Sequence, residues 1–217
     1  MESAATIQRE YISFLTQQNF PCIAAKAAVA KKNIQCMVAY HMECPAQDEA
    51  ILNFMYRFVD GYRASAQPYH SAAIIFHQPL DLSEEKFDTL MWKRLKHLSH
   101  LDKQKYKHDP RVNEDPSSAK FSFSLKEEAF FIIGLHPQSK RNARRFKYPS
   151  LVFNPHAEFE RLRKLNRYEK MKEAVRKRDL EYSGSVNPIL KDFGELSEIY
   201  QYSGVRHDEK WKCPLSE

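Results

Sequence analysis

The segment from Gly134 to Phe159, GLHPQSKRNARRFKYPSLVFNPHAEF, gathers side chains that can bind metals, protons and anions. His136 directly follows the apolar run AFFIIGL, and His156 comes shortly after the apolar run LVF. Three arginines stand between these histidines: Arg141, Arg144 and Arg145. A histidine can bind a metal or carry a proton, and an arginine fork binds planar carboxylates and phosphates. The segment therefore predicts a histidine site beside an anion site, at the ends of two buried strands.

The arginines are the candidates for the anion site. If Ser139 caps a short helix after Pro137, the three guanidinium groups share one helix face and lie near the free N–H groups of the first turn. The bound anion would then be the propionates or phosphates of a cofactor. The opposite interpretation is that these arginines pair with acidic residues of the chain, which the segments NEDP and DFGELSE supply.

Two metal sites can be tested against the sequence. The HAE triplet from His156 to Glu158 matches the first half of a zinc deaminase motif, but the P-C-x-x-C half is missing because Cys213 is the only later cysteine. A ferrous site made of His136, His156 and Glu158 stays open as a non-haem iron oxygenase, since two histidines and a carboxylate leave positions for oxygen and substrate. Taken alone, His136 stays open between a metal ligand and a structural hydrogen-bonding group.

Another histidine group, His97, His100 and His108, lies on and after a predicted helix. His97 and His100 are neighbours at helical spacing, but no second element completes a metal site. We therefore interpret this group as a surface or half-buried one.

The run from Arg161 to Arg178 is rich in Lys and Arg, as a nucleic-acid-binding surface would be. Glutamates and aspartates are interleaved with these cations at helical spacing, which is typical of a solvated face with ion pairs. No nucleic-acid-binding motif occurs, so no nucleic-acid partner is expected.

Hydrophobic periodicity predicts the elements that must position these side chains. Ile7, Tyr11 and Phe14 mark the first of two opening helices, and Ser83 is a suitable N-cap for a later helix. The expected elements that follow the opening helices are a strand over 34–41, a helix over 46–65, a strand over 69–79, a helix over 84–104, a hairpin over 119–135 that turns near 126–128, a strand over 150–154, a helix over 156–182 and a mostly irregular tail that folds back onto the domain.

This order predicts an α+β fold in which residues 1–217 form a single domain, with a central, mostly antiparallel or mixed sheet of about five strands covered by helices. The composition supports a sizeable core, since 42% of the 217 residues are apolar. The formal net charge of +6 allows an anionic partner but identifies none.

The cysteines and the apolar runs indicate the compartment. Cys22, Cys36, Cys44 and Cys213 lie far apart and are expected to be free thiols. The apolar runs are too short to span a membrane, and the first residues do not resemble a secretory signal. A cytoplasmic protein without a membrane partner is therefore expected.

Several motifs together resemble the YqcI/YcgG family over almost the whole chain. They are NFPC, DPSSAKFSFSL, FFIIGLHPQSKRNARRF, YPSLVFNPHAEFERLR, RDLEYSGSVNPIL, GELSEIYQYSG and WKCP. The resemblance implies a haem protein, similar to N-oxygenases that hydroxylate an amine or guanidino nitrogen, among them the pre-guanitoxin N-hydroxylase of guanitoxin biosynthesis. Relatives that oxidise arginine or lysine side chains imply a small, amino-acid-like substrate.

The resemblance also implies roles for single residues. The histidine of the G-x-H-P element falls on His136, which becomes the expected axial ligand of haem b, with the thiolate of Cys22 as a weaker alternative. The arginines of the same motif, Arg141, Arg144 and Arg145, would hold the propionates. Asn154 and His156 of the F-N-x-H element would lie on the distal side or behind the ligands. Glu158 stands where a glutamine is equally expected.

The expected chemistry needs further partners. Haem supplies oxygen activation, and AFFII, LVF, Trp92, Phe121 and Phe123 would form an apolar wall around it. The sequence has no G-x-G-x-x-G fingerprint, so the electrons for O₂ would come from a separate ferredoxin or reductase, which a basic surface would suit. Four carboxylates are candidates for the substrate cation: Asp115, Asp192, Glu195 and Glu198. A haem-binding or haem-sensing protein without turnover is the alternative.

Overall fold

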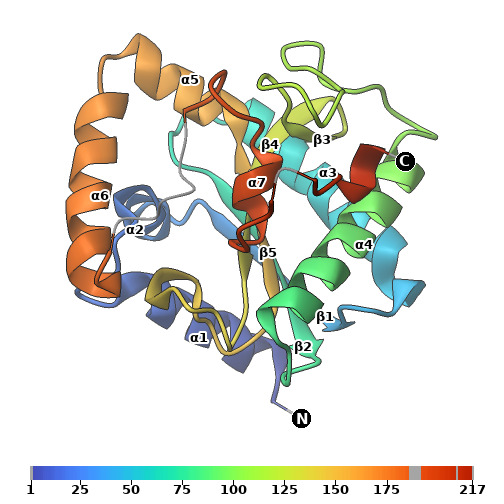
Figure 1. Ribbon diagram of the computed structural model, residues 1–217, viewed down its shortest axis with the longest axis horizontal. Coiled ribbons are helices and arrows are strands. Elements are labelled where there is room, and N and C mark those ends of the chain that lie inside the picture. The colour runs from blue at the N-terminus through green and yellow to red at the C-terminus, as the bar shows by residue number, and fades with distance from the viewer. Residues whose placement is uncertain (1, 186–191, 209, 217) are drawn as a thin grey trace.

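The computed structural model describes residues 2–185, 192–208 and 210–216, and its centre is a five-stranded mixed sheet (Figure 1). The strand order is β1-β2-β5-β4-β3. The first two strands are parallel, and every other neighbouring pair is antiparallel. The strand bounds are β1 Ile34–His41, β2 Ser71–Gln78, β3 Phe123–Leu125, β4 Glu128–Leu135 and β5 Ser150–Pro155. The predicted α+β class and the sheet of about five strands are confirmed.

Helices cover both faces of this sheet, and its central strands are accordingly mostly apolar in their middle residues. In the described residues there are seven α-helices: α1 Ala4–Thr16, α2 Ile23–Ala30, α3 Asp48–Ala64, α4 Glu84–Asp102, α5 His156–Lys164, α6 Tyr168–Ser183 and α7 Ile199–Tyr202. Figure 1 places α3 and α4 on one side of the sheet and α1, α2, α5 and α6 on the other. Ser83 accepts the N–H of Lys86 and caps α4, as predicted.

Each face of the sheet has its own hydrophobic core. On the α3 and α4 side, Phe130 and Ile132 of β4 and Trp92 of α4 are buried together. On the opposite side, Leu135 of β4 and Val152 of β5 pack against α1. Alternate residues of one strand therefore belong to different cores, because successive side chains point to opposite faces.

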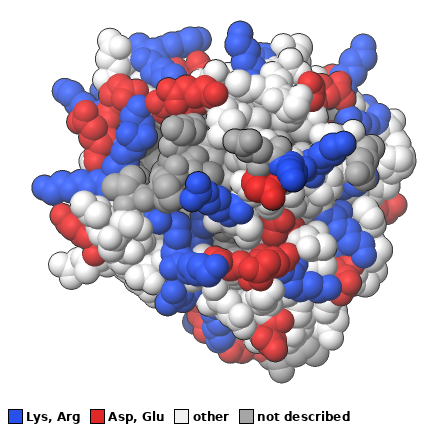
Figure 2. Space-filling view, viewed as in Figure 1, with Lys and Arg blue, Asp and Glu red and all other residues white. Residues whose placement is uncertain are grey.

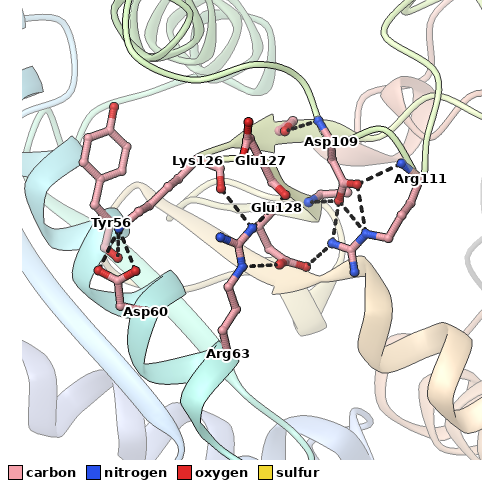
Figure 3. A network of polar contacts seen from close by, with 10 residues as sticks. Tyr56, Asp60, Arg63, Asp109, Arg111, Lys126, Glu127 and Glu128 are labelled. Carbon is pink, nitrogen blue, oxygen red and sulfur yellow. Dashed lines mark hydrogen bonds and ion pairs between the residues drawn. The ribbon is translucent and has the colours of Figure 1, made fainter.

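The β3–β4 hairpin turns at Lys126 and Glu127, within the predicted region. Both residues have positive φ angles, 52° and 55°, which strain non-glycine residues. Arg63 of α3 holds this turn, since its guanidinium donates to the carbonyl oxygens of Lys126 and Glu127 and to the carboxylate of Glu128 (Figure 3). The predicted strand before the turn is shorter than expected, because β3 begins only at Phe123.

The predicted helix over 156–182 is wrong in one respect, since it is two helices. Asn166 adopts a left-handed conformation with a φ of 55° between α5 and α6. Leu165, expected on the buried repeat, is 53% exposed. The chain therefore changes direction at 165–167, and α6 lies apart from the axis of α5 (Figure 1).

The tail folds back onto the domain as predicted. Tyr202 of α7 is fully buried and stacks on Trp92 of α4, and Trp211 packs on the same tryptophan. Cys213 is buried in the core between these aromatic rings and α4. The tail motif residues 186–190 lie outside the described residues.

Candidate functional site

A cavity of about 310 Å³ lies between the sheet and the helices α2, α5 and α6. The sheet contributes alternate residues of β4, namely Phe131, Ile133 and Leu135. The helices contribute apolar side chains: Ala25 and Ala28 of α2, Leu162 of α5, and Met171 and Val175 of α6. The walls are therefore mostly apolar, and the volume falls in the range of small-molecule sites.

His156 lies at the polar end of this cavity, where β5 ends and α5 begins. Its Nδ1 is 3.6 Å from Oε1 of Glu198, and its Nε2 is 3.6 Å from Oε1 of Glu160. Phe193 packs on the ring with 4.3 Å between the ring centroids. Nδ1 is buried without a hydrogen bond, so the imidazole can accept one from a ligand.

Glu158 lies near His156 on α5, and its partner is His70. Oε1 of Glu158 is 3.6 Å from Nδ1 of His70, and Oε2 accepts the N–H of Tyr69 at 3.1 Å. The side chains of Glu158 and His70 are 10% and 8% exposed. Nδ1 of His70 also lacks a hydrogen bond. The cavity thus contains a second histidine beside a carboxylate.

Asn154 of β5 lines the cavity, and its side chain is hydrogen-bonded to the two neighbouring strands. Its Oδ1 lies 3.1 Å from the hydroxyl of Ser71, and its Nδ2 donates to the carbonyl of Phe131 at 3.3 Å. Asn154 therefore joins β2, β5 and β4 directly beneath the polar end.

His136 lies on the other face of the sheet from the cavity and is not among its lining residues. Its ring stacks on Phe87 of α4, with 4.5 Å between centroids and 19° between planes. The glycine at position 134 permits this approach, because a Cβ there would lie 2.6 Å from the Phe87 ring. Burial lowers the pKa of His136 to about 4, so the ring is neutral at pH 7. Its predicted role as the axial ligand stays a prediction, and in this structure an aromatic ring covers it.

The three arginines do not share a helix face, because the residues after Ser139 form only a 3-10 turn over Asn142–Arg144. Arg144 is buried and donates to the carbonyls of Gly134, Gln201 and Tyr202, which fastens α7 to β4. Burial lowers the pKa of its guanidinium to about 10.

The other two arginines differ in position. Arg141 lines the cavity and pairs with Asp179 of α6 at 2.5 Å. Arg145 is exposed, and its Nε donates to the carbonyl of Ser139 at 2.8 Å. Arg141 therefore pairs with an acidic residue of the chain, but with Asp179 and not with the NEDP or DFGELSE segments, and Arg144 bonds main-chain carbonyls. The role of the arginines with propionates stays a prediction.

Cys22 lines the cavity at the first turn of α2. Its Sγ accepts the N–H of Ala25 at 3.4 Å and caps the helix. Burial raises the pKa of this thiol, which disfavours the thiolate that haem iron binds.

The ferrous triad of His136, His156 and Glu158 is not assembled, since the sheet separates His136 from the other two residues. Within the described ranges no group of three His, Cys, Asp or Glu side chains could hold a metal ion. His97 and His100 are exposed and His108 is half-buried, as the surface interpretation expects.

The residues expected to form the apolar wall around the haem lie on both faces of the sheet, and the wall itself stays a prediction. Trp92, Phe121 and Phe123 belong to the core on the α3 and α4 side, because the sheet stands between them and the cavity. Phe131 and Ile133 from AFFII and Val152 from LVF do line it.

Of the four carboxylates that could bind the substrate cation, two line the cavity and two do not. Glu198 and Asp192 line the cavity, whereas Asp115 and Glu195 are exposed elsewhere. Asp192 accepts Tyr168 Oη at 3.0 Å and Lys172 Nζ at 2.8 Å.

Some of the cations of α5 and α6 form ion pairs with carboxylates. Arg163 pairs with Glu160, and Lys172 pairs with Glu169 and Asp192. On the face shown in Figure 2, Lys and Arg side chains alternate with Asp and Glu side chains. This pattern is that of a solvated surface with ion pairs, as the sequence indicates.

Comparison with known proteins matches a family model over residues 11–216, which is that of the YqcI/YcgG family. The chain belongs to the YqcI/YcgG family. Two relatives are the uncharacterized proteins YqcI and YcgG of Bacillus subtilis (strain 168). YqcI is 26% identical over 209 residues, which cover 92% of this chain and 81% of the relative. YcgG is 27% identical over 208 residues, with 91% and 81% covered.

No solved structure matches the chain with significance. Among the described residues, no helix is both long and apolar enough to cross a bilayer.

The family motif places His156 at the cavity, but it does not include His70, which sequence reasoning missed. Ala72 pairs with Phe153 in the β2–β5 ladder, so the residues before β2 run beside Asn154 and the start of α5. A histidine directly before a buried strand was the available signal. The pairing of β2 with β5 joins residues far apart in the chain, and no local pattern reveals it.

Proposed function

We propose that the protein is a haem-dependent N-oxygenase that hydroxylates an amine or guanidino nitrogen of a small, amino-acid-like substrate with O₂ and electrons from an external donor. The observation that carries this proposal is the cavity between the sheet and α6, which combines apolar walls with two buried histidines. The resemblance of the family motifs to the pre-guanitoxin N-hydroxylase branch supports the same activity.

The residues around the cavity fit a haem in their chemistry. His156 and His70 each present a buried ring nitrogen without a hydrogen bond, which is the donor that haem iron needs. Arg176 lines the cavity and could accompany the propionates, whereas Arg141 and Lys172 line it in ion pairs with Asp179 and Asp192. We assign His156, in place of the expected His136, as the first candidate for the axial ligand, because His156 lines the cavity and presents a buried ring nitrogen without a hydrogen bond.

Haem would supply the activation of O₂, and the chain would supply the surroundings of the reaction. The apolar side chains of α2, β4 and α6 exclude water from the cavity. Asn154 keeps the polar end rigid through its bonds to β2 and β4. The pair of Glu158 and His70 could take up the proton that leaves the substrate nitrogen, because a carboxylate and a neutral imidazole both act as general bases.

The partners follow from the chemistry. A ferredoxin or a separate reductase in the cytoplasm would deliver the electrons, and the formal charge of +6 would attract an acidic donor.

Expression with a haem supply and an absorption spectrum test the cofactor. We expect a Soret band that His156→Ala alters, whereas His97→Ala, at an exposed histidine, leaves it unchanged. His136→Ala and His70→Ala in the same series locate the ligand independently. A wild-type protein that binds no porphyrin would refute the proposal.

Turnover is tested separately. Arginine, lysine and related guanidines are incubated with the haem-loaded protein, a reductant and O₂, and the product is analysed by mass spectrometry. Addition of one oxygen atom to a substrate nitrogen is the expected result. A loaded protein that yields no oxygenated product would be a haem-binding protein without turnover.

A further inference from the structure

We propose that Glu158 and Glu198 form a subsite for the cationic head group of an alkylamine or alkylguanidine at the polar end of the cavity. The inference rests on the proposed function for its place in the reaction, but its evidence is the charge and the hydrogen bonding of the cavity itself.

The first step is the balance of charge around the cavity. Three of the lining cations already have carboxylate partners: Arg141 with Asp179, Arg163 with Glu160, and Lys172 with Glu169 and Asp192. Arg144 is used by main-chain carbonyls. In the part of the chain that the structure describes, Glu158 and Glu198 have histidines as their nearest charged partners. Among the described residues, Glu158 and Glu198 therefore lack a Lys or Arg within 4 Å, and Arg176 is the one further lining cation for which the structure shows no ion pair.

The second step is the environment of these two carboxylates. Glu158 and Glu198 are 7% and 5% exposed, so water screens them little. Glu198 is held in place because its Oε2 accepts hydrogen bonds from the hydroxyls of Ser122 and Tyr202. Its Oε1 instead faces His156 at 3.6 Å, beyond hydrogen-bonding distance. A buried carboxylate with one oxygen that accepts no hydrogen bond destabilises the folded protein unless a ligand neutralises the charge.

The third step is the presence of acceptors beside the carboxylates. Nδ1 of His156 and Nδ1 of His70 are buried, line the polar end and make no hydrogen bond. A guanidinium or ammonium group has several N–H donors and no acceptor. Two carboxylate oxygens, together with the imidazole nitrogen that does not bind iron, therefore match a cation better than they match an anion or a neutral carbonyl group.

The apolar part of the cavity indicates what kind of group the bound cation would carry. Beyond the polar end the walls are apolar, with Ile133 and Val152 on the sheet and Met171 and Val175 on α6. An alkyl chain attached to the cation can lie along these walls, where burial of its methylene groups contributes to affinity. The subsite would thus orient the nitrogen of the substrate toward the histidines.

The test compares a cation with its neutral isostere. Isothermal titration calorimetry of the full chain, purified with any haem it binds, uses butylguanidinium, butylammonium and butylurea as probes. We expect butylguanidinium to bind about 10-fold or more tightly than butylurea, because hydrogen bonds to charged groups are stronger than neutral ones. Glu158→Gln and Glu198→Gln should each remove most of this preference. Glu173→Gln, at an exposed glutamate of α6 that does not line the cavity, is the matched control and should keep it.

The outcomes separate the subsite from the proposed enzyme. Equal affinity for butylguanidinium and butylurea, or no binding of either, overturns the subsite even when the Soret band is present. An unchanged preference in both glutamine variants overturns the assignment to these residues. A preserved preference in a protein without porphyrin supports the subsite and refutes only the haem enzyme. Circular dichroism shows whether each variant is folded.

Discussion

Replacing Asp109 with asparagine should destabilise the protein, because this carboxylate joins a long loop to the β3–β4 hairpin. Asp109 is fully buried. Its oxygens accept the main-chain N–H groups of Arg111 and Ala129 at 2.9 and 2.8 Å, and Arg111 Nη2 donates to it at 2.6 Å (Figure 3). Asparagine keeps one oxygen and places an NH₂ group where the other accepted hydrogen bonds.

The magnitude follows from these contacts. Breaking a buried ion pair from one side costs about 3–5 kcal/mol. The Arg111 side chain is 51% exposed, so water screens its attraction to Asp109. The lower end of the range of about 3–5 kcal/mol therefore applies. We therefore expect the free energy of unfolding to fall by about 3 kcal/mol, out of the roughly 5–15 kcal/mol typical of a domain. The melting temperature should fall by about 6–12 °C.

Urea unfolding followed by circular dichroism measures this difference at several pH values. Burial raises the pKa of Asp109, but the hydrogen bonds from Arg111 and the main chain outweigh burial and hold the pKa below its usual value. The carboxylate therefore contributes fully above pH about 4, and its contribution is lost as the pH falls through the lowered folded-state pKa. The difference in the free energy of unfolding between wild type and Asp109→Asn should thus become smaller at acidic pH.

The matched control is Asp115→Asn, an exposed carboxylate in the same loop, which should leave stability unchanged. A loss below about 1 kcal/mol at pH 7 for Asp109→Asn, or a gap that stays constant into acid, would refute the reasoning.

Three further predictions concern single positions. Gly134→Ala should destabilise by about 1–3 kcal/mol in thermal unfolding, because its Cβ would lie 2.6 Å from Phe87, whereas Gly61→Ala in helix α3 should stabilise by about 0.5–1 kcal/mol. Glu127→Gly should raise the free energy of unfolding by about 0.5–1 kcal/mol because its φ of 55° suits glycine; a loss of stability would contradict the strain at this turn. Glu158→Gln should stabilise the ligand-free protein by about 1 kcal/mol, since it removes a buried charge, and a marked decrease would show that the charge is satisfied without a ligand.

The strands and most helices could be predicted from the sequence because their signals are local. The apolar runs of β2 and β4 and the Ser83 cap of α4 depend only on neighbouring residues. The break at Asn166 could not be predicted in this way, because Leu165 before it and Tyr168 and Met171 after it continue the same helical repeat. A left-handed residue ends α5 even though the pattern of apolar residues suggests that the helix goes on.

The site was harder to predict because its residues are far apart in the sequence and are brought together by the pairing of strands. The alternation in β4 separates His136 from Ile133 and Leu135, but the sequence does not show which helices cover each face. His156 was found because its motif lies at the end of β5. His70 joins it only through the antiparallel pairing of β2 with β5, which local reasoning cannot reach.

The separation of α5 from α6 also affects how the interior exchanges molecules with solvent. Only Asp179 of α6 is buried, so this helix has little apolar area anchoring it to the rest of the protein. Its amide hydrogens should exchange with deuterium well before those of β2, whose Ala72 to Phe76 are fully buried. A molecule as large as the cavity can therefore enter or leave by local opening of α6, while the sheet and Asn154 beneath it keep their positions.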